Sequence, residues 1–434
     1  MTSTSYATAL RRSLQFYEAQ RSGPLPQSNR IPWRRTAFET DAVPGGYFDA
    51  GDHLKLVFPM ATSLAFMGIA AVEFPEGFKA GKQLSKIRET LRWGADFLVG
   101  CHVAPTKLIG QIGDPGPDHA YWGPPELYKG PRPQYTWNLE TQPASDLAGA
   151  VASALAVTAL ACANDAPYAS NLLKHAEQLY AVGKRCQGVY SDQYTNVTHV
   201  YKSGSFKDDL ALAATLLWRA TKEASYLHDA TALRASKDFN PNSFVSWDSV
   251  GVLSAILLDG WGHGTAEGTV HIDRFLEDWQ AGRNGFAYTP KGLCIAPLGG
   301  WGNLRYSTTA AFAQLLCAKF SKQRREKALA FARQQLDYAL GLRGSDRSFV
   351  VGVGKNPPTR PHHRAASCPP GTSGWVHYES PKPNPHVIAG ALVGGPKGPG
   401  DDYTDDRKDF QQNEVALDFN AGYTGALAGL LQLC

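Results

Sequence analysis

The chain has 434 residues and a small basic excess, with 43 lysines and arginines against 39 aspartates and glutamates. The basic residues are scattered along the sequence and gather on no predicted face, which argues against nucleic acid and anionic membranes as partners. Glycine is enriched at 43 residues and charged residues make up only 19% of the chain, which indicates a large core with long, shaped loops.

Apolar residues recur at helical spacing along most of the chain, and no stretch alternates apolar and polar residues as a half-buried strand does. In one segment Leu329, Ala332, Leu336 and Ala339 share a face, and Gly341 follows as a helix stop. The spacing predicts an all-α protein of about twelve helices. They are expected at residues 5–20, 58–73, 84–102, 146–163, 168–185, 207–223, 225–236, 247–259, 268–282, 306–321, 323–340 and 419–433.

The segment LAGAVASALAVTALACAN, from Leu147, is the longest uncharged stretch and approaches the length that spans a membrane. Alanine, serine and threonine dominate it, and these residues transfer poorly into lipid. We therefore expect a helix that is buried on all sides of a protein outside the membrane. Because both chain ends are helical, the helices are expected to close into a ring of hairpins with an apolar inner layer and an amphipathic outer layer.

Four long irregular stretches separate the helices, at residues 21–57, 103–145, 286–305 and 342–418, and they are rich in glycine, proline and aromatic residues. Loops of this length in a compact domain usually carry function. No low-complexity linker divides the series, so the prediction is one domain over residues 1–434. Its functional residues are expected at one rim of the ring.

The stretch GGYFDAGDHLKLVFPM places Asp49 and Asp52 three positions apart, with only Ala50 and Gly51 between them. A tight turn there would aim both carboxylates at one small volume, where one takes a proton from a water molecule that the other orients. The alternative is structural, because aspartates near glycines also make turns and cap helices, here the helix that begins near Pro59. Taken alone, the motif favours this alternative.

Glu414 lies where the acidic stretch from Asp401 gives way to the last apolar helix, next to Asn413 and before Val415. A carboxyl group with apolar neighbours tends to have a raised pKa, as a general acid requires. The alternative interpretation is that Glu414 stabilises the N-terminus of that helix.

The loop VVGVGKNPPTRPHHR ends in His362, His363 and Arg364, whose side chains can hydrogen-bond hydroxyl groups or steady a carboxylate. Histidines with a purely structural role explain the pattern equally well. A metal centre is not indicated here, since adjacent histidines rarely bind one metal and Cys368 alone adds no ligand set. The seven cysteines of the chain are too widely spaced for a zinc knuckle or a thioredoxin-type pair.

Aromatic residues stand on two glycine-rich loops, in DHAYWGPPE and GGWGNLRY. Trp122, Trp301 and Tyr306 are the rings in question. Flat apolar rings with polar companions suit the faces of sugars, although an aromatic residue in a loop also packs against the scaffold.

With these motifs together, the chain resembles glycoside hydrolase family nine, the endoglucanases and cellulases with an (α/α)6 barrel, over essentially its whole length. The segments similar to the family's motifs are, in chain order, SLQFYEAQRSGPLPQSNRIPWR, GGYFDAGDHLKLVFPMA, GKNPPTRPHHR and YTDDRKDFQQNEVALDFNAG. Four long motifs in the family's order make coincidence implausible. The lack of an appended carbohydrate-binding module or linker resembles the single-domain animal-type members.

The resemblance implies a role for each matched residue. Asp52 would be the general base, Asp49 would help to hold the nucleophilic water, and Glu414 would be the general acid. The substrate cleft would be lined by His119, Trp122, Trp301, Tyr306, His362, Arg364 and Phe419. A structural calcium ion would be held by backbone oxygens of Gly204 and Ser205 and by the side chains of Asp208, Asp209 and Asp248, and hard oxygen ligands suit calcium on chemical grounds too.

Two positions depart from the family pattern. Asp209 stands where the family usually has glutamate, so the calcium-binding side chain is one methylene shorter. Phe419 stands where a tyrosine commonly follows the catalytic glutamate, so one hydroxyl contact near the acid is missing. Neither departure removes a catalytic group.

The resemblance implies an inverting endo-β-1,4-glucanase that acts on cellulose and related β-glucans. In such enzymes the two carboxyl groups stand about 6.5–9.5 Å apart, which leaves room for the attacking water. The same fold could also serve a processive or mixed-linkage β-glucanase, or a carbohydrate-binding protein without turnover. A terpenoid cyclase or prenyltransferase is disfavoured because no aspartate-rich initiator or zinc set is found. The protein is expected to be a secreted monomer whose signal peptide has been removed.

Overall fold

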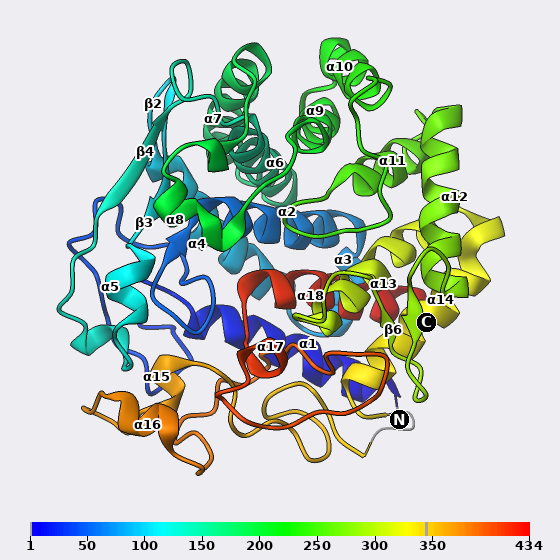
Figure 1. Ribbon diagram of the computed structural model, residues 1–434. Helices are drawn as coiled ribbons and strands as arrows, with labels where there is room; N and C mark the ends of the chain where they lie inside the picture. Colours follow the sequence, from blue (N-terminus) through cyan, green and yellow to red (C-terminus); the bar gives the residue numbers. More distant parts are fainter. Residues whose placement is uncertain (1, 343–345) are drawn as a thin grey trace.

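The computed structural model describes residues 2–342 and 346–434. Six helices form a closed inner ring in which each helix contacts the next (Figure 1). In the predicted alanine-rich segment, now helix α6, Leu160 is the one residue that is not fully buried, which confirms its inner position. The inner helices are α2 (Val57–Glu73), α6 (Ser145–Ala161), α9 (Lys207–Thr221), α11 (Gly251–Gly260), α13 (Asn303–Phe320) and α18 (Leu417–Leu433), and α18 closes the ring against α2.

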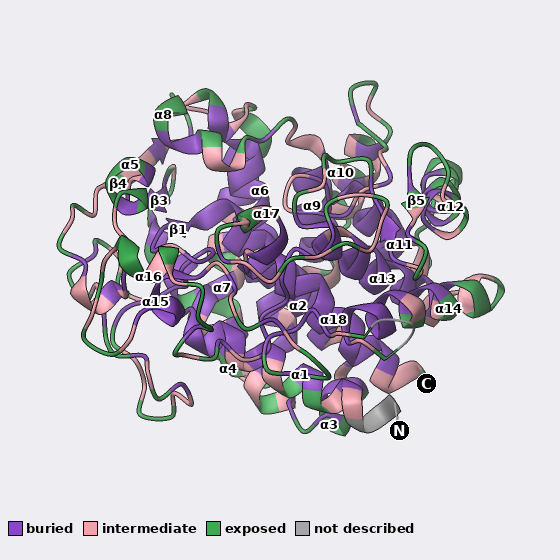
Figure 2. Cartoon of the chain, turned by 60° about the horizontal axis from the view of Figure 1, so that its bottom comes forward, coloured by how far each residue is buried: buried purple, intermediate pink, exposed green. Residues whose placement is uncertain are grey.

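Six further helices form an outer layer, each packed against one inner helix. They are amphipathic: α4 buries Ile87, Leu91, Ala95 and Leu98 along one face and exposes the other. Outer and inner helices alternate along the chain, which is the (α/α)6 arrangement, and buried residues fill the centre of the molecule (Figure 2). The outer helices are α1 (Thr2–Ala19), α4 (Leu84–Cys101), α7 (Ala166–Arg185), α10 (Ala224–Arg234), α12 (Ala266–Ala281) and α14 (Lys322–Ala339).

All twelve predicted helices are present, most within a few residues of the expected bounds. The largest differences fall on two inner helices. Helix α11 starts at Gly251 because Ser246 and Ser249 pair with each other in a turn before it. Helix α13 starts earlier than expected, at Asn303, directly after Gly302 in a left-handed conformation.

The irregular stretches contain short elements that the apolar pattern does not reveal. Antiparallel strands β1 (Lys55–Leu56), β2 (His102–Ala104) and β4 (Gln134–Asn138) all pair with β3 (Lys107–Ile112), and β5 (Ala287–Tyr288) pairs with β6 (Cys294–Ile295). The short helices are α3 (Pro75–Ala80), α5 (Pro115–His119), α8 (Thr195–Thr198), α15 (Arg364–Ser367), α16 (Trp375–Glu379) and α17 (Phe410–Asn413). Single turns of 3-10 helix lie at Pro125–Leu127, Tyr190–Asp192 and His199–Tyr201.

The two ends of the chain pack together, since α1 contacts α18. All seven cysteines carry free thiols, and five of them are fully buried. Within residues 2–342 and 346–434, none of the helices combines the length and apolarity needed to cross a bilayer.

Candidate active site

A cavity of about 570 Å³ opens at one rim of the barrel. Its walls come from segments that precede or open all six inner helices, α2, α6, α9, α11, α13 and α18. All ten residues predicted as catalytic or substrate-binding line it. They are Asp49, Asp52, His119, Trp122, Trp301, Tyr306, His362, Arg364, Glu414 and Phe419.

Backbone hydrogen bonds hold the motifs in place around the cavity. The aspartate motif accepts a hydrogen bond from the histidine motif, in which the Arg364 N–H donates to the Gly51 carbonyl at 3.0 Å. It accepts another from the glutamate motif, in which the Leu417 N–H donates to the Asp49 carbonyl at 2.9 Å. The histidine and glutamate motifs are joined by the His362 N–H, which donates to the Asn413 carbonyl at 2.8 Å. The relative positions of the three motifs are therefore set by main-chain contacts.

The opening motif supports the same turn from beneath. The buried Gln20 side chain donates to the carbonyls of Phe48 and Ala50, and its own oxygen lies 3.0 Å from Nε2 of His363. Gly51 is required at this point, because a Cβ there would lie 2.3 Å from the His362 carbonyl oxygen. The small residues between the two aspartates thus permit close approach of the histidine loop.

Neither aspartate acts as a helix cap. The N-cap of α2 is Leu56, which makes no side-chain cap hydrogen bond. The Asp52 carboxylate instead lies 3.0 Å from Nε2 of His119, and this contact raises the pKa of the histidine. Asp49 is 2% exposed and accepts a hydrogen bond from the Tyr201 hydroxyl at 2.8 Å. Both carboxyl groups line the cavity, and Asp52 also supports the turn, because its Oδ1 accepts a hydrogen bond from the Leu54 N–H at 3.4 Å.

The environment of Asp49 favours its neutral form. Burial is the main cause, and the nearby carboxyl groups of Asp52 and Asp418 act in the same direction, so that the pKa of Asp49 lies well above its usual range. The Tyr201 hydrogen bond opposes this shift. Asp52, with its side chain 10% exposed, is thus the aspartate in better contact with solvent.

Glu414 is held in a different way. It directly follows α17 and precedes α18, whose N-cap is Ala416, so it does not cap the last helix. Its Oε2 accepts a hydrogen bond from the Trp301 indole at 2.9 Å. Burial raises the pKa of Glu414 to about 7, and the charge of Asp52 adds to the shift. Near neutral pH this group therefore holds a proton for a substantial part of the time.

The paired histidines have separate roles. His363 is buried and structural, because its two ring nitrogens contact Gln20 and the Ala366 N–H. His362 faces the cavity, and its Nδ1 lies 2.6 Å from the Arg407 carbonyl. Burial lowers the pKa of His362 to about 4, so the imidazole is neutral and can exchange hydrogen bonds with hydroxyl groups.

The aromatic residues divide in the same manner. Trp301 is 42% exposed and offers a free ring face, whereas Trp122 is 1% exposed and packs between His362 and Tyr378. Phe419 is also buried and lies beneath the Arg305 guanidinium at 4.9 Å from its ring centre.

Sequence reasoning missed several residues of the wall. Trp375 and Tyr378 stand three positions apart in the glycine- and proline-rich stretch 369–383, which is the signal that pointed to Trp122 and Trp301. Arg305, next to Tyr306, pairs with the buried Asp418 at 2.8 Å. The further lining residues are Ala50, Val200, Tyr201, Trp247, Leu298, Arg305, Trp375, Tyr378 and Phe410.

The residues predicted to bind calcium meet beside the cavity, between the starts of α9 and α11. Asp208 accepts hydrogen bonds from Ser205 Oγ at 2.6 Å and from the Val250 N–H at 3.0 Å, and Asp248 accepts from the Gly204 N–H at 3.2 Å. The fifth residue, Asp209, is fully buried in α9. Burial, followed by the charges of neighbouring carboxyl groups, raises the pKa of Asp209 well above its usual range.

This group of acids fits a hard cation in ligand type and in charge. No basic side chain is paired with Asp208, Asp209 or Asp248 within the described residues. The carboxylates of Asp208, Asp209 and Asp248 do not converge as tightly as the side chains of Asp52, Asp118 and His119. In that second group one possible ligand atom of each residue lies within 4.8 Å of the others. Backbone oxygens, as predicted at Gly204 and Ser205, would have to complete the coordination.

A double ring of helices with carboxyl groups and sugar-sized aromatic rings at one rim defines a class, the helical-barrel glycoside hydrolases. The profile of "Glycosyl hydrolase family 9" matches residues 6–427. Endoglucanase B of Cellulomonas fimi is 38% identical over 99% of this chain, and the chain spans 42% of that relative's length. The chain belongs to glycosyl hydrolase family 9.

Solved structures agree with this assignment. The endoglucanase of the termite Nasutitermes takasagoensis superposes with a TM-score of 0.91 at 38% identity, covering 99% of both chains. The cellulase Cel9M of C. cellulolyticum, in complex with cellobiose, gives a TM-score of 0.89 at 35% identity over 98% of both chains. The predicted family and barrel are thereby confirmed.

Proposed function

We propose that this chain is an endo-β-1,4-glucanase that hydrolyses internal bonds of cellulose and related β-glucans with inversion. The observation that carries the proposal is the contrast between Asp52 and Glu414 on one cavity, the former paired with a histidine and the latter with a pKa raised to about 7. The relative bound to cellobiose, a fragment of cellulose, supports a β-1,4-linked glucan as substrate.

In the proposed reaction Glu414 gives its proton to the glycosidic oxygen as the bond from that oxygen to the anomeric carbon breaks. Asp52 takes a proton from a water molecule on the opposite face of the sugar, and the water oxygen bonds to the same carbon. Asp49, held by Tyr201, orients that water from the side. A single displacement of this kind inverts the anomeric configuration.

Binding would rest on the walls of the cavity. The exposed face of Trp301 suits a pyranose ring, and the neutral imidazole of His362 and the Arg364 guanidinium suit its hydroxyl groups. Trp375 is 46% exposed on the same wall and offers a second ring face. These groups add mostly to binding, whereas the three carboxyl groups supply the chemistry.

The direct experiment is to incubate the purified protein with carboxymethylcellulose and measure reducing ends together with viscosity. An endo-acting enzyme lowers viscosity early, when few ends have been released. Release of ends at nearly constant viscosity would point to processive action instead. Binding to cellulose without release of ends would mean that the chain is a carbohydrate-binding protein and would overturn the proposal.

We also propose that calcium binds at Gly204, Ser205, Asp208, Asp209 and Asp248, where its charge would compensate the buried carboxylates. The segments on either side of this group carry Tyr201 and Trp247 into the cavity wall, so a bound ion would stiffen that wall. Because its substrate is a polymer, the enzyme would act outside the cell, in keeping with the expected secretion.

A further inference from the structure

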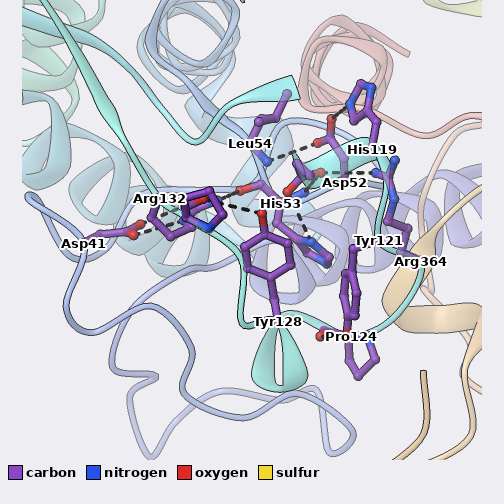
Figure 3. A network of polar contacts seen from close by, with 12 residues as sticks. Asp41, Asp52, His53, Leu54, His119, Tyr121, Pro124, Tyr128, Arg132 and Arg364 are labelled. Atoms are coloured by element: carbon purple, nitrogen blue, oxygen red, sulfur yellow. Dashed lines mark hydrogen bonds and ion pairs between the residues drawn. The ribbon is translucent and has the colours of Figure 1, made fainter. Parts of the chain in front are cut away.

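The wall behind Asp52 contains another buried carboxyl group, Asp118, which is 1% exposed. It belongs to the short helix α5, in which it directly precedes His119. His119 reaches the Asp52 carboxylate on the cavity side (Figure 3). Asp118 contacts His53 and Arg364. Two consecutive residues of α5 thus contact the aspartate motif, His119 at the cavity and Asp118 in the protein interior.

Asp118 is attached to the residue that follows Asp52. Its Oδ1 accepts a hydrogen bond from the His53 N–H at 3.3 Å, and its Oδ2 lies 3.4 Å from Nδ1 of the same histidine. The His53 ring is otherwise surrounded by aromatic rings at 5.7–6.2 Å between centroids. Those rings belong to Phe38, Phe48, Tyr121 and Tyr128. Asp118 is therefore the anchor for an imidazole in an apolar cage.

The carbonyl of His53 is held by a second ionic group, Arg132 with Asp41. Arg132 donates to the His53 carbonyl at 2.7 Å and pairs with Asp41 (Figure 3). Asp41 also pairs with Lys55. The two peptide groups that flank His53 are thus both held, the one that joins it to Asp52 at its N–H by Asp118 and the next one at its carbonyl by Arg132. Since a short side chain follows its backbone, these contacts set where the Asp52 carboxylate points.

Asp118 also holds a residue of the histidine motif. A guanidinium nitrogen of Arg364 lies 3.6 Å from Asp118 Oδ1, and the guanidinium lies over the Trp122 ring at 5.5 Å from its centre. Burial by itself would raise the pKa of Asp118, but His53 and Arg364 outweigh it and hold the pKa at about 2. Asp118 is consequently an anion throughout the working range of the enzyme.

We propose that Asp118 is a positioning residue whose buried negative charge fixes the His53 peptide and holds the Arg364 side chain, so that the Asp52 carboxylate stays free to accept a proton from water. The Asp52 and Asp118 carboxylates lie within 4.8 Å of each other. Without the charge on Asp118, Arg364 would be drawn to Asp52 and would occupy the base. The inference rests on the proposed hydrolase function.

The test compares two buried aspartates in the full chain. Asp118→Asn keeps the side-chain volume and removes the charge, and we expect kcat on cello-oligosaccharides to fall by about 100-fold, with a smaller rise in KM because Arg364 also lines the cavity. Asp278→Asn is the control, because Asp278 is 2% exposed and hydrogen-bonded on α12 but does not line the cavity. It should lower the melting temperature and leave kcat of the folded enzyme unchanged.

A substrate with a good leaving group separates a positioning role from a general loss of activity. A dinitrophenyl cello-oligosaccharide needs little help from an acid but still needs the base, so the Asp118→Asn deficit should persist on it. If that variant does not fold, His53→Phe keeps the ring packing and the backbone N–H bond to Asp118 but removes the imidazole contact, and should give a smaller loss of kcat in the same direction.

Three results would overturn the inference while leaving the hydrolase proposal intact. They are wild-type kcat in Asp118→Asn, or in His53→Phe where that variant is used instead, an equal loss of kcat in Asp278→Asn, and full recovery of Asp118→Asn on the activated substrate. An inactive wild-type protein would instead contradict the proposed function itself, so the two failures are distinguishable.

Discussion

The two sides of the cavity place their carboxyl groups, Asp52 and Glu414, in different electrostatic surroundings. On the aspartate side, Asp52 lies among polar groups, with His119 in contact and the Asp118 network behind it. On the glutamate side, the Trp301 indole is the hydrogen-bond donor to a half-buried carboxyl group whose pKa is raised to about 7, chiefly by desolvation. Two chemically similar side chains are thereby given different surroundings on one cavity.

The two sides also differ in how many contacts hold the carboxyl group in place. Main-chain bonds hold both sides, but the base side adds two ion pairs and an aromatic cage, whereas the Glu414 side chain is held by one indole. The base must be oriented toward a separate water molecule, whereas the acid acts on the glycosidic oxygen of the bound polymer. Perturbing each side should therefore have different consequences.

The largest effect is expected for Asp52→Asn. The substitution removes the proton acceptor and keeps the shape, so turnover of carboxymethylcellulose should fall between about 100- and 10,000-fold. Reducing-end release at saturating substrate measures it. Near wild-type turnover would show that Asp52 is not the base.

Glu414→Gln tests the other side. On natural glucans its loss should approach that of the aspartate variant, but a dinitrophenyl cello-oligosaccharide should recover most of the rate, because such a leaving group needs no proton. Asp52→Asn is the matched control and should stay slow on both substrates. Equal recovery, or none, in the two variants would contradict the assignment of acid and base.

The pH dependence follows from the same contrast. Because Glu414 must be protonated to act and its pKa is raised to about 7, kcat should fall above about pH 7, by about tenfold per unit once the proton is lost. A raised carboxyl pKa in the folded state also means that its contribution to stability is present at low pH and is lost as the pH rises through about 7. A rate that stays level to pH 9 would contradict the raised pKa.

Calcium removal should have the smallest effect on chemistry. If the ion binds at Asp208, Asp209 and Asp248, calcium at 100 times its dissociation constant adds about 2.7 kcal/mol to the free energy of unfolding. Dialysis against a chelator should lower the melting temperature and weaken substrate binding modestly, with full recovery on adding calcium back. Asp209→Asn should abolish the calcium response, and an unchanged melting temperature in wild type would exclude the site.

Sequence reasoning reached the barrel and the catalytic motifs for different reasons. The helices were predictable because their apolar spacing is dictated by burial, and an inner helix such as α6 is apolar on every side. The DAGD turn and Glu414 were ambiguous alone, since aspartates and glutamates cap helices more often than they catalyse. Only the order of four motifs resolved that ambiguity.

What the sequence could not supply is the contact between distant segments. Asp118 is one of many acidic residues in the chain, and nothing in its neighbourhood indicates that it meets His53 and Arg364, which are 65 and 246 positions away. The need for glycine at position 51 also cannot be predicted from the sequence, because it arises from the histidine loop that packs against it. The strands escaped prediction because four of the six have only two or three residues, and the longest, β3, is buried at five consecutive positions and shows no alternation.

The central claim is a single displacement between a base at Asp52 and a proton donor at Glu414, and the configuration of the first product tests it most directly. Proton NMR during hydrolysis of cellopentaose resolves the newly formed anomers before they equilibrate. We predict that the α-anomer appears first at each new reducing end. Initial accumulation of the β-anomer would mean retention through a covalent intermediate, and it would contradict the account.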